Sequence, residues 1–330
     1  MARLVLHIGT HKTGTSSLQN AFWRRRDLLA SHGIIYPDFG TAHSHHGLLG
    51  AMHPDLARLY PLPKPPEALM AELAARHAAS DATVILSSEE FSRGSPARRF
   101  NFRAFRRSCG FERVEVVAVL RPQLPYLQSV FLEVIKQIAV PWDKFFMQSL
   151  KTELAHGLYL NFNDLDDHLL SAFAADEITY LDYDAAMLMP GGSTGAVLAH
   201  LGLPPDSPGL NLAGDRRDNA SPEPLVVLAA LGLSDAKQLA PGLQDFLGEV
   251  YRDHFGAGVR STLYGTRRAE RLLAHFTPLN ARFRARIARR GGVPPALNLK
   301  TFPPETLTAD RLDAEFWREV ARRFYANLEH

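Results

Sequence analysis

Short apolar runs rich in β-branched residues alternate with longer helical patterns, and this alternation constrains the fold more than any other feature of the chain. Runs of this kind are typical of strands. The strand-like runs are Leu4–Ile8, Ile34–Tyr36, Thr83–Leu86, Val114–Leu120 and Ile178–Leu181. The helical patterns cover Thr15–Ser31, Pro66–Ala79, Pro125–Gln137 and Leu165–Ala174. This order predicts an α/β fold in which a central, mostly parallel sheet is flanked by helices on both faces.

Helical patterns dominate the last third of the chain. With 330 residues, 46% of them hydrophobic, the chain can bury a large core. We expect an α/β core over residues 1–205 and a helical C-terminal region over residues 206–330 that belongs to the same domain and covers the acceptor side. Within this region, the Arg-rich segment Arg282–Pro295 is expected to be an exposed connector. The amphipathic pattern Ala309–Leu328 predicts a final helix, which packs either on its own chain or at a homodimer face.

Charge and cysteine content exclude several classes of function. Lys and Arg number 37 against 35 Asp and Glu, and this net charge of +2 gives no general field for nucleic acid or an anionic membrane. One cysteine, Cys109, excludes a disulfide framework and a multi-cysteine zinc site. The longest apolar run, Leu225–Leu233, is about half a membrane span. We therefore expect a cytoplasmic protein with no transmembrane segment and no nucleic-acid partner.

The loop between the first strand and the first helix is rich in glycine and hydroxyl residues. The segment HIGTHKTGTSSLQ, residues 7–19, has Gly9 and Gly14 at the spacing of a nucleoside-triphosphate loop, GxxxxGK[ST]. Here Thr15 follows the second glycine, and Lys12 lies before it. Backbone N–H groups at a helix N-terminus form a cradle for phosphate. Lys12 at the crest of the loop suits a ligand with one phosphate in the cradle and a transferable group bonded just beyond it.

The loops after three of the expected strands should meet at one edge of the sheet. Because the strands are parallel, the chain segments after Ile8, Leu86 and Leu120 leave the sheet at the same edge. Ligands of such sheets bind at this edge, at the carboxyl ends of the strands. Arg121 follows the third of these strands, and Ser129 lies eight residues further on, about two turns into the next helix. An arginine fork with a serine hydroxyl suits a terminal phosphate.

The segment THKTGTSSL, residues 10–18, resembles the 5′-phosphosulfate loop of the sulfotransferase superfamily, which takes a sulfuryl group from 3′-phosphoadenosine 5′-phosphosulfate (PAPS). The pair Arg121 and Ser129 resembles the 3′-phosphate segment of this family. The resemblance implies a P-loop-like three-layer fold, PAPS as the donor, and stabilisation of the leaving phosphate by Lys12. The donor-binding residues that it implies are Thr10, His11, Lys12, Thr13, Gly14, Thr15, Ser16, Ser17, Arg121 and Ser129. Because sulfuryl carries less charge than phosphoryl, these groups can replace Mg²⁺, and no metal is expected.

Two later segments also resemble the family. Ile178–Pro205 is similar to its late strand, its acidic and aromatic turn, and its helix ending in LGLP. We expect this segment to pack against the sheet and to make no chemical contact. Asp215–Leu225 resembles an Arg/Asn/Ser segment of some bacterial members, in which Arg217 is a candidate for reaching the nucleotide.

The catalytic base has candidates at the end of the third expected strand. Sulfuryl transfer to a hydroxyl needs a group within hydrogen-bond reach of the acceptor's proton. The segment Val84–Ser92 carries Glu89 and Glu90 at the expected edge. In the family a catalytic His or Glu often occupies this strand end, which favours Glu89. The alternative is helix capping, because Ser88 followed by two acids suits a helix N-terminus.

The segment HSHHGLL, residues 43–49, supplies rival candidates for the base. An unperturbed imidazole titrates at about pH 6.5, so His46 or His45 suits proton transfer near neutral pH. His43 and these two lie too close together for a helical His-x-x-x-His metal pair, and no acid is placed beside them. A base soon after the second strand, as in some family members, also makes Asp38 a candidate. A polar loop without catalytic function is the remaining interpretation.

The acceptor and two rival functions stay open at this stage. Family members sulfate steroids, phenols, glycans, lipids and protein tyrosines. The polar and aromatic mixture of Tyr36–Pro66 favours a small-molecule or glycan acceptor, such as a carbohydrate or glycolipid. The rivals are a P-loop kinase that uses Mg-ATP and a nucleotide- or glycan-binding module without catalysis.

Overall fold

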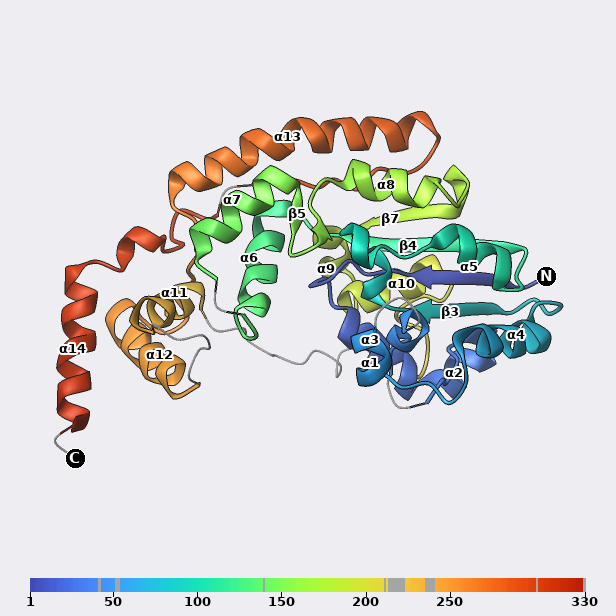
Figure 1. Cartoon of the computed structure of the whole chain (residues 1–330), viewed down its shortest axis with the longest axis horizontal. Helices are drawn as coiled ribbons and strands as arrows, with labels where there is room; N and C mark the ends of the chain where they lie inside the picture. The colour runs from blue at the N-terminus through green and yellow to red at the C-terminus, as the bar shows by residue number, and fades with distance from the viewer. Residues whose placement is uncertain are drawn as a thin grey trace. The chain divides into compact units, whose positions relative to one another are not determined.

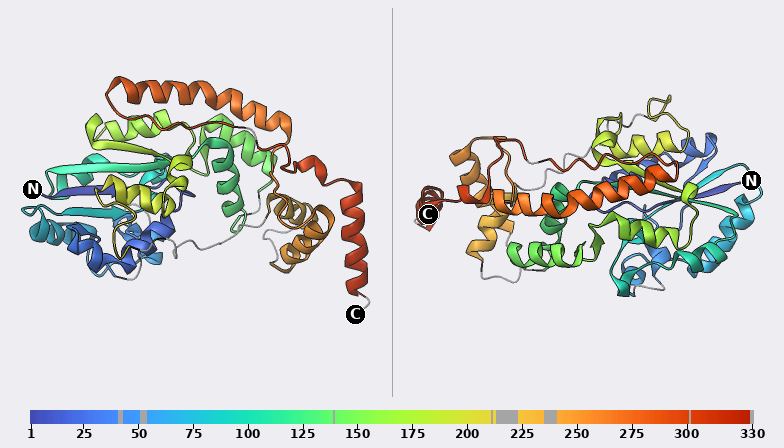
Figure 2. Two further views of the ribbon diagram at one scale, coloured as in Figure 1. Left: turned by 180° about the vertical axis from the view of Figure 1, so that it is seen from behind. Right: turned by 90° about the horizontal axis from the view of Figure 1, so that it is seen from above.

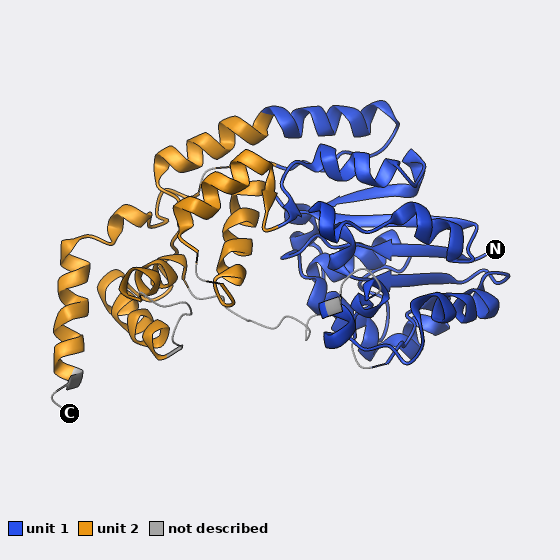
Figure 3. Cartoon of the chain, viewed as in Figure 1, with its two compact units in different colours: residues 1–122, 157–218, 278–297 blue, residues 123–156, 219–277, 298–330 orange. Residues whose placement is uncertain are grey.

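The chain divides into two compact units, each assembled from separated stretches of sequence (Figure 3). The computed structural model describes residues 1–40, 43–50, 54–138, 140–210, 212, 223–234, 241–300 and 302–328. Unit 1 consists of Met1–Pro122, Gly157–Asp218 and Pro278–Leu297. Unit 2 consists of Gln123–His156, Asn219–Thr277 and Asn298–His330. The division into residues 1–205 and 206–330 stays a prediction.

A parallel sheet forms the centre of unit 1. Within the described residues it has five strands in the order β2-β3-β1-β4-β7, and each pairing is parallel. The strands are β1 (Arg3–His7), β2 (Ile34–Ile35), β3 (Thr83–Ser87), β4 (Arg113–Leu120) and β7 (Ile178–Asp182). Strands covered on both faces are rich in apolar residues, and such runs located all five strands in the sequence. β6 (Leu158–Tyr159) also belongs to this unit.

Helices cover both faces of this sheet (Figures 1 and 2). The helices of unit 1 are α1 (Thr15–Arg24), α2 (Arg26–Ser31), α3 (Pro54–Leu59), α4 (Pro66–His77), α5 (Phe102–Ser108), α8 (Phe162–Leu170), α9 (Tyr183–Leu188) and α10 (Gly192–His200). On one face, α1, α2 and α10 share an apolar core that includes Val5, Phe22 and Val197. On the other face lie α4, α5 and α8 (Figures 1 and 2). The predicted three-layer α/β fold is confirmed.

The first predicted helix is divided in two. The prediction of one helix over Thr15–Ser31 is wrong at Arg25, where φ is −111° and ψ is 19°. The backbone N–H of this residue still donates to Ala21 O at 3.2 Å and closes α1. The change of direction lets α2 bury Leu29 in the core of unit 1.

The Arg-rich segment is also a helix for part of its length. The prediction of an exposed connector over Arg282–Pro295 is wrong up to residue 289, because α13 (Thr266–Arg289) runs through it. Phe283 and Ile287 are buried, and their four-residue spacing places them on one helix face. Arginine side chains of this segment bind the buried carboxylate of Asp166 at 2.8 and 3.0 Å. Their charges are therefore paired inside unit 1.

Unit 2 is mainly helical. Its elements are α6 (Gln123–Val134), α7 (Trp142–Thr152), β5 (Leu154–Ala155), α11 (Pro224–Leu233), α12 (Pro241–Phe255), residues 266–277 of α13, and α14 (Ala314–Leu328). Its interior is aromatic, with the Trp142 ring 4.9 Å from Phe131 and 5.2 Å from Tyr264. Among the described residues, no helix has both the length and the apolar composition to span a membrane.

The predicted amphipathic helix at the C-terminus packs on its own chain. It begins at Ala314, five residues later than the sequence pattern indicated. Phe324 lies 6.3 Å from Phe246 of α12, and Arg323 Nη1 bonds Asp253 at 2.7 Å. A homodimer stays a prediction.

Candidate functional site

The loop after β1 leaves the carboxyl edge of the sheet and turns sharply into α1. Its first residues continue the pairing with β4, since Thr10 N donates to Val119 O at 2.9 Å. Gly9 and Gly14 have φ of 85° and 89°, in the left-handed region that favours glycine. Lys12 at the crest also has a positive φ, 58°. The predicted order of strand, glycine loop and helix is confirmed.

Three threonine hydroxyls hold the shape of this loop. Thr13 Oγ1 donates to Thr10 O at 2.5 Å, and Thr15 Oγ1 donates to the same oxygen at 3.2 Å. Thr10 Oγ1 donates to a β4 carbonyl at 3.2 Å. All three side chains are buried. The loop is thus fixed from inside, and its outer surface is formed by other groups.

The start of α1 faces outward and carries hydroxyls. Gly14 precedes the helix and supplies no side-chain cap, while Ser16 and Ser17 are exposed in the first turn. Such a helix end attracts an anion through its N–H groups and its dipole. Beside it lies a cavity of about 120 Å³, whose lining includes Gly14, Ser17, Tyr183 and Ser193. The first turn of α1 can therefore accept a phosphate group.

Arg121 reaches the loop from the end of β4. Its Nη1 donates to Lys12 O at 3.0 Å. Its guanidinium lies 4.8 Å from the centre of the Tyr183 ring, within cation–π range. The loop lysine and the strand-end arginine therefore lie at one place on the sheet edge. Tyr183, at the start of α9, was expected to pack only, and this contact with a site residue had no sequence signal.

Two other candidate nucleotide contacts stay predictions. Ser129 lies half-buried on α6, in unit 2, whereas Arg121 belongs to unit 1. Arg217 lies outside the described residues.

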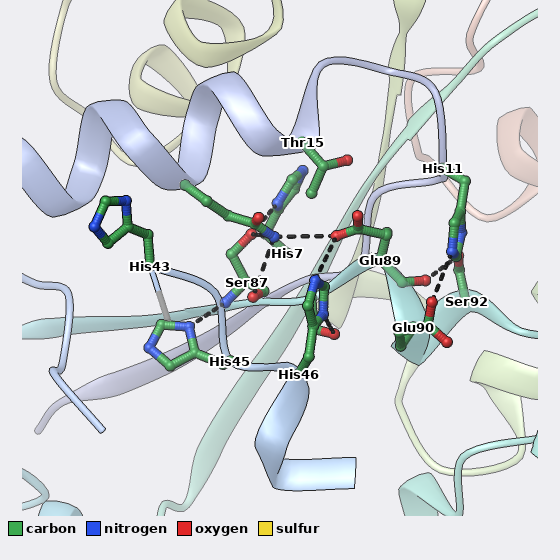
Figure 4. A network of polar contacts seen from close by, with 12 residues as sticks. His7, His11, Thr15, His43, His45, His46, Ser87, Glu89, Glu90 and Ser92 are labelled. Carbon is green, nitrogen blue, oxygen red and sulfur yellow. Dashed lines mark hydrogen bonds and ion pairs between the residues drawn. The ribbon is translucent and has the colours of Figure 1, made fainter. Parts of the chain in front are cut away.

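Glu89 follows β3 and packs directly on the glycine loop (Figure 4). A methyl group at Gly9 would lie 2.9 Å from Glu89 Cβ, so only glycine allows this approach. From α1, Gln19 Nε2 donates to Glu89 Oε2 at 3.0 Å. The carboxylate is therefore held between the loop and the helix that follows it.

His46 lies beside Glu89, so the two rival candidates form a pair (Figure 4). His46 Nε2 is 3.7 Å from Glu89 Oε2, and its Nδ1 is 2.7 Å from Ser88 Oγ. Burial lowers the pKa of His46, and the charge of Glu89 opposes this shift. The lowered pKa favours the neutral form of this imidazole.

The other acids have different surroundings. Glu90 accepts from His11 Nε2 at 3.0 Å and from Arg93. Burial raises the pKa of Glu90, but the hydrogen bonds from these two residues outweigh it and hold the pKa well below the usual range. Asp38 lies in an exposed turn, where it accepts from Gly40 N at 2.8 Å. Glu89 is the acid that contacts both the loop, at Gly9, and α1, at Gln19.

The remaining histidines of the cluster diverge. His45 Nδ1 accepts from Ser87 N at 2.9 Å, and burial lowers the pKa of His45 to about 4. His43 Nδ1 lies 2.7 Å from Asn20 Oδ1, and its ring stacks on Trp23. In the part of the chain that is described, no His, Cys, Asp and Glu side chains gather in a metal-binding group of three or more.

Gln19 is the site residue that the sequence reasoning missed. Its signal is its position, because Thr15, Leu18, Gln19 and Phe22 occupy the buried stripe of α1 at spacings of three and four. A polar residue in such a stripe needs a hydrogen-bond partner.

A scan against protein-family models found no match, and a search of the curated proteins found none either. A search of solved structures found similar chains. One is a sulfotransferase from Alicyclobacillus acidocaldarius, with 13% identity and a TM-score of 0.47, covering 86% of this chain and 95% of that chain. Another is the sulfotransferase domain of the Synechococcus PCC 7002 olefin synthase, with 12% identity and a TM-score of 0.38, covering 83% and 94%. The function proposed below rests on the geometry of the site.

Proposed function

We propose that this chain is a sulfotransferase that moves a sulfuryl group from PAPS to an acceptor hydroxyl. The contact between Arg121 Nη1 and Lys12 O carries the proposal. This contact brings the arginine at the end of β4 next to the lysine of the glycine loop. A nucleotide with phosphates at both its 5′ and 3′ positions needs two cationic groups close together, one for each phosphate.

The residues of the cradle fit such a donor. Gly9 and Gly14 allow close approach, and the uncapped first turn of α1 exposes its serines. When bound, PAPS supplies a sulfuryl group on a phosphate leaving group. The residues that would hold it at the 5′ end are His11, Lys12, Thr13, Gly14, Thr15, Ser16 and Ser17, with Arg121 at the 3′-phosphate. Thr13 and Thr15 would contribute backbone N–H groups, because their hydroxyls donate to Thr10 O, and Thr10 itself is bonded to β4.

Lys12 neutralises the charge that develops on the leaving phosphate oxygen. Its ammonium is a compact point charge on a flexible stem, suited to one oxygen. Preorganised charge at the place where charge develops is the largest single contribution to catalysis in many enzymes.

Glu89 removes the acceptor's proton in this proposal. The acceptor oxygen loses its proton to the carboxylate and forms a bond to sulfur, while the bond from sulfur to the phosphate oxygen breaks. Glu89 suits this role because it packs on the glycine loop, whereas burial lowers the pKa of His46 and so makes its imidazole a weaker base. The acceptor is a small molecule or glycan, as the sequence between Tyr36 and Pro66 favours.

Thermal unfolding in the presence of nucleotides tests the donor before the acceptor is known. The PAP nucleotide, the product of PAPS, should raise the unfolding temperature by several degrees, since a ligand at 100 times its Kd stabilises by about 2.7 kcal/mol. Mg-ATP and NAD should not. Protection by Mg-ATP alone would favour the kinase. Protection by PAP without transfer from PAPS to any of a broad set of phenols, alcohols and oligosaccharides would favour the non-catalytic module.

A further inference from the structure

Gln19 is a buried primary amide on a mostly apolar face of α1. Its exposed fraction is 5%, and it lies in the same buried stripe as Leu18 and Phe22. Burial of an amide costs free energy unless its hydrogen bonds are made. Gln19 Nε2 makes them to the end of β3, at 3.0 Å to Glu89 Oε2 and 3.3 Å to Ser87 Oγ. The amide is therefore directed at the carboxylate.

We propose that Gln19 is a positioning residue that aims Glu89 at the acceptor hydroxyl. This inference rests on the proposed function. The contacts of Gln19 Nε2 and His46 Nε2 with Glu89 are both made to Oε2, at 3.0 and 3.7 Å. Oε1 is thus the oxygen that takes the proton, and the two contacts fix its direction.

The position of Gln19 also ties the base to the donor. Gln19 lies one helical turn after Thr15, in the helix whose first turn forms the phosphate cradle. At 1.5 Å per residue, a rigid rise of about 6 Å separates the two positions. One short helix therefore sets the distance between the bound phosphate and the carboxylate. Reacting groups must be held to within fractions of an ångström for full activity, which gives this link its value.

Several other titratable groups face this carboxylate, so the test must isolate it. Burial lowers the pKa of His7 to about 4 and lowers that of His46, and it raises the pKa of Tyr36 and Tyr60, while the charge of Glu89 acts on all four. Further charges act on His46. They come from His11, Glu90 and Arg93. The effect of a Gln19 substitution on the pH profile is therefore measured both in the wild type and in a variant without the Glu89 carboxylate. The difference between the two effects excludes the contributions of these neighbours.

The experiment is the pH dependence of PAPS turnover by the full chain, with the best acceptor from a set of phenols, alcohols and oligosaccharides. Gln19→Met keeps the length of the side chain and removes the donor. We expect kcat to fall about tenfold, the KM for PAPS to stay within about twofold, and the acid limb to move to higher pH by about one unit, because the lost hydrogen bond favours only the charged carboxylate. In a Glu89→Gln background the same change should have no further effect.

Gln19→Glu supplies a second variant of the same shape. Two adjacent carboxylates cannot both ionise easily, so the acid limb should move further up than in Gln19→Met. Asn20→Ala is the matched control, because Asn20 is an amide residue on the same helix whose side chain bonds His43. The pH profile of this variant should equal that of the wild type.

Distinct outcomes separate this inference from the proposed function. Absence of PAPS turnover in the wild type contradicts the function itself. Turnover in the wild type with unchanged pH profiles in both Gln19 variants overturns the inference. So does a variant that loses protection by PAP together with turnover, because Gln19 would then support the cradle and not the base.

Discussion

Replacement of Gly9 by alanine tests how closely the loop packs on the proposed base. The left-handed conformation at φ 85° costs a residue other than glycine about 1–2 kcal/mol. A methyl group there would lie 2.9 Å from Glu89 Cβ and 3.2 Å from its Cα. These atoms move only with the backbone, and such overpacking costs about 1–3 kcal/mol. We expect Gly9→Ala to lower the free energy of unfolding in urea by roughly 2–5 kcal/mol and to reduce kcat as well.

Gly33→Ala is the matched control for this prediction. Gly33 has φ 74°, and no atom of the described chain lies within 4 Å of a methyl group built there. Only the conformational cost of about 1–2 kcal/mol remains. Equal losses of stability in the two variants would refute the close contact between the loop and Glu89.

Three further predictions concern the site and its buried histidines. Lys12→Ala should abolish PAPS-dependent transfer and leave thermal unfolding nearly unchanged, because the leaving phosphate loses its neutralising charge; near-normal turnover would overturn this role. At saturating donor, Glu89→Gln should lower kcat by about 10²–10⁴-fold and His46→Gln by only about tenfold; a larger loss in His46→Gln would make the histidine the base. Stability in urea should fall as the pH drops from 6.5 towards 4. Burial lowers the pKa of His7 and His45 to about 4, so only the unfolded chain takes up protons in this window, at about 1.4 kcal/mol per pH unit for each residue. A stability that stays constant over this range would contradict the neutral histidines.

The sheet could be predicted from sequence because its signals are local. Val116–Leu120 is a continuous apolar run, and a strand buried on both faces is typically apolar in this way. The Arg-rich segment was predicted to be an exposed connector because of its many charges. The helical spacing of its two buried residues, Phe283 and Ile287, is a weak signal among these charges. The partner that neutralises these arginines, Asp166, lies more than 100 residues away in sequence. No local pattern reveals such a partner.

The site, like the fold, has a part that the sequence indicated and a part that only the structure shows. The phosphate loop is one contiguous segment, so its residue types and spacing indicated it. His46 and Glu89 were rivals in the sequence because 43 positions separate them, and only the fold brings them to 3.7 Å. Gln19 was missed because an amide within a helix has no motif of its own. Only its hydrogen bond to Glu89, just after β3, connects it with the site.

The central claim is that Lys12 and Arg121 bind two phosphates of one nucleotide. Calorimetric titration with PAP and with adenosine 5′-phosphate, which lacks the 3′-phosphate, tests it most directly. We predict that the wild type prefers PAP by about 10–100-fold, as a charged hydrogen bond of 1.5–3 kcal/mol implies. Arg121→Ala should lose this preference and still bind adenosine 5′-phosphate. An Arg121→Ala variant that keeps the full preference for PAP would contradict the claim.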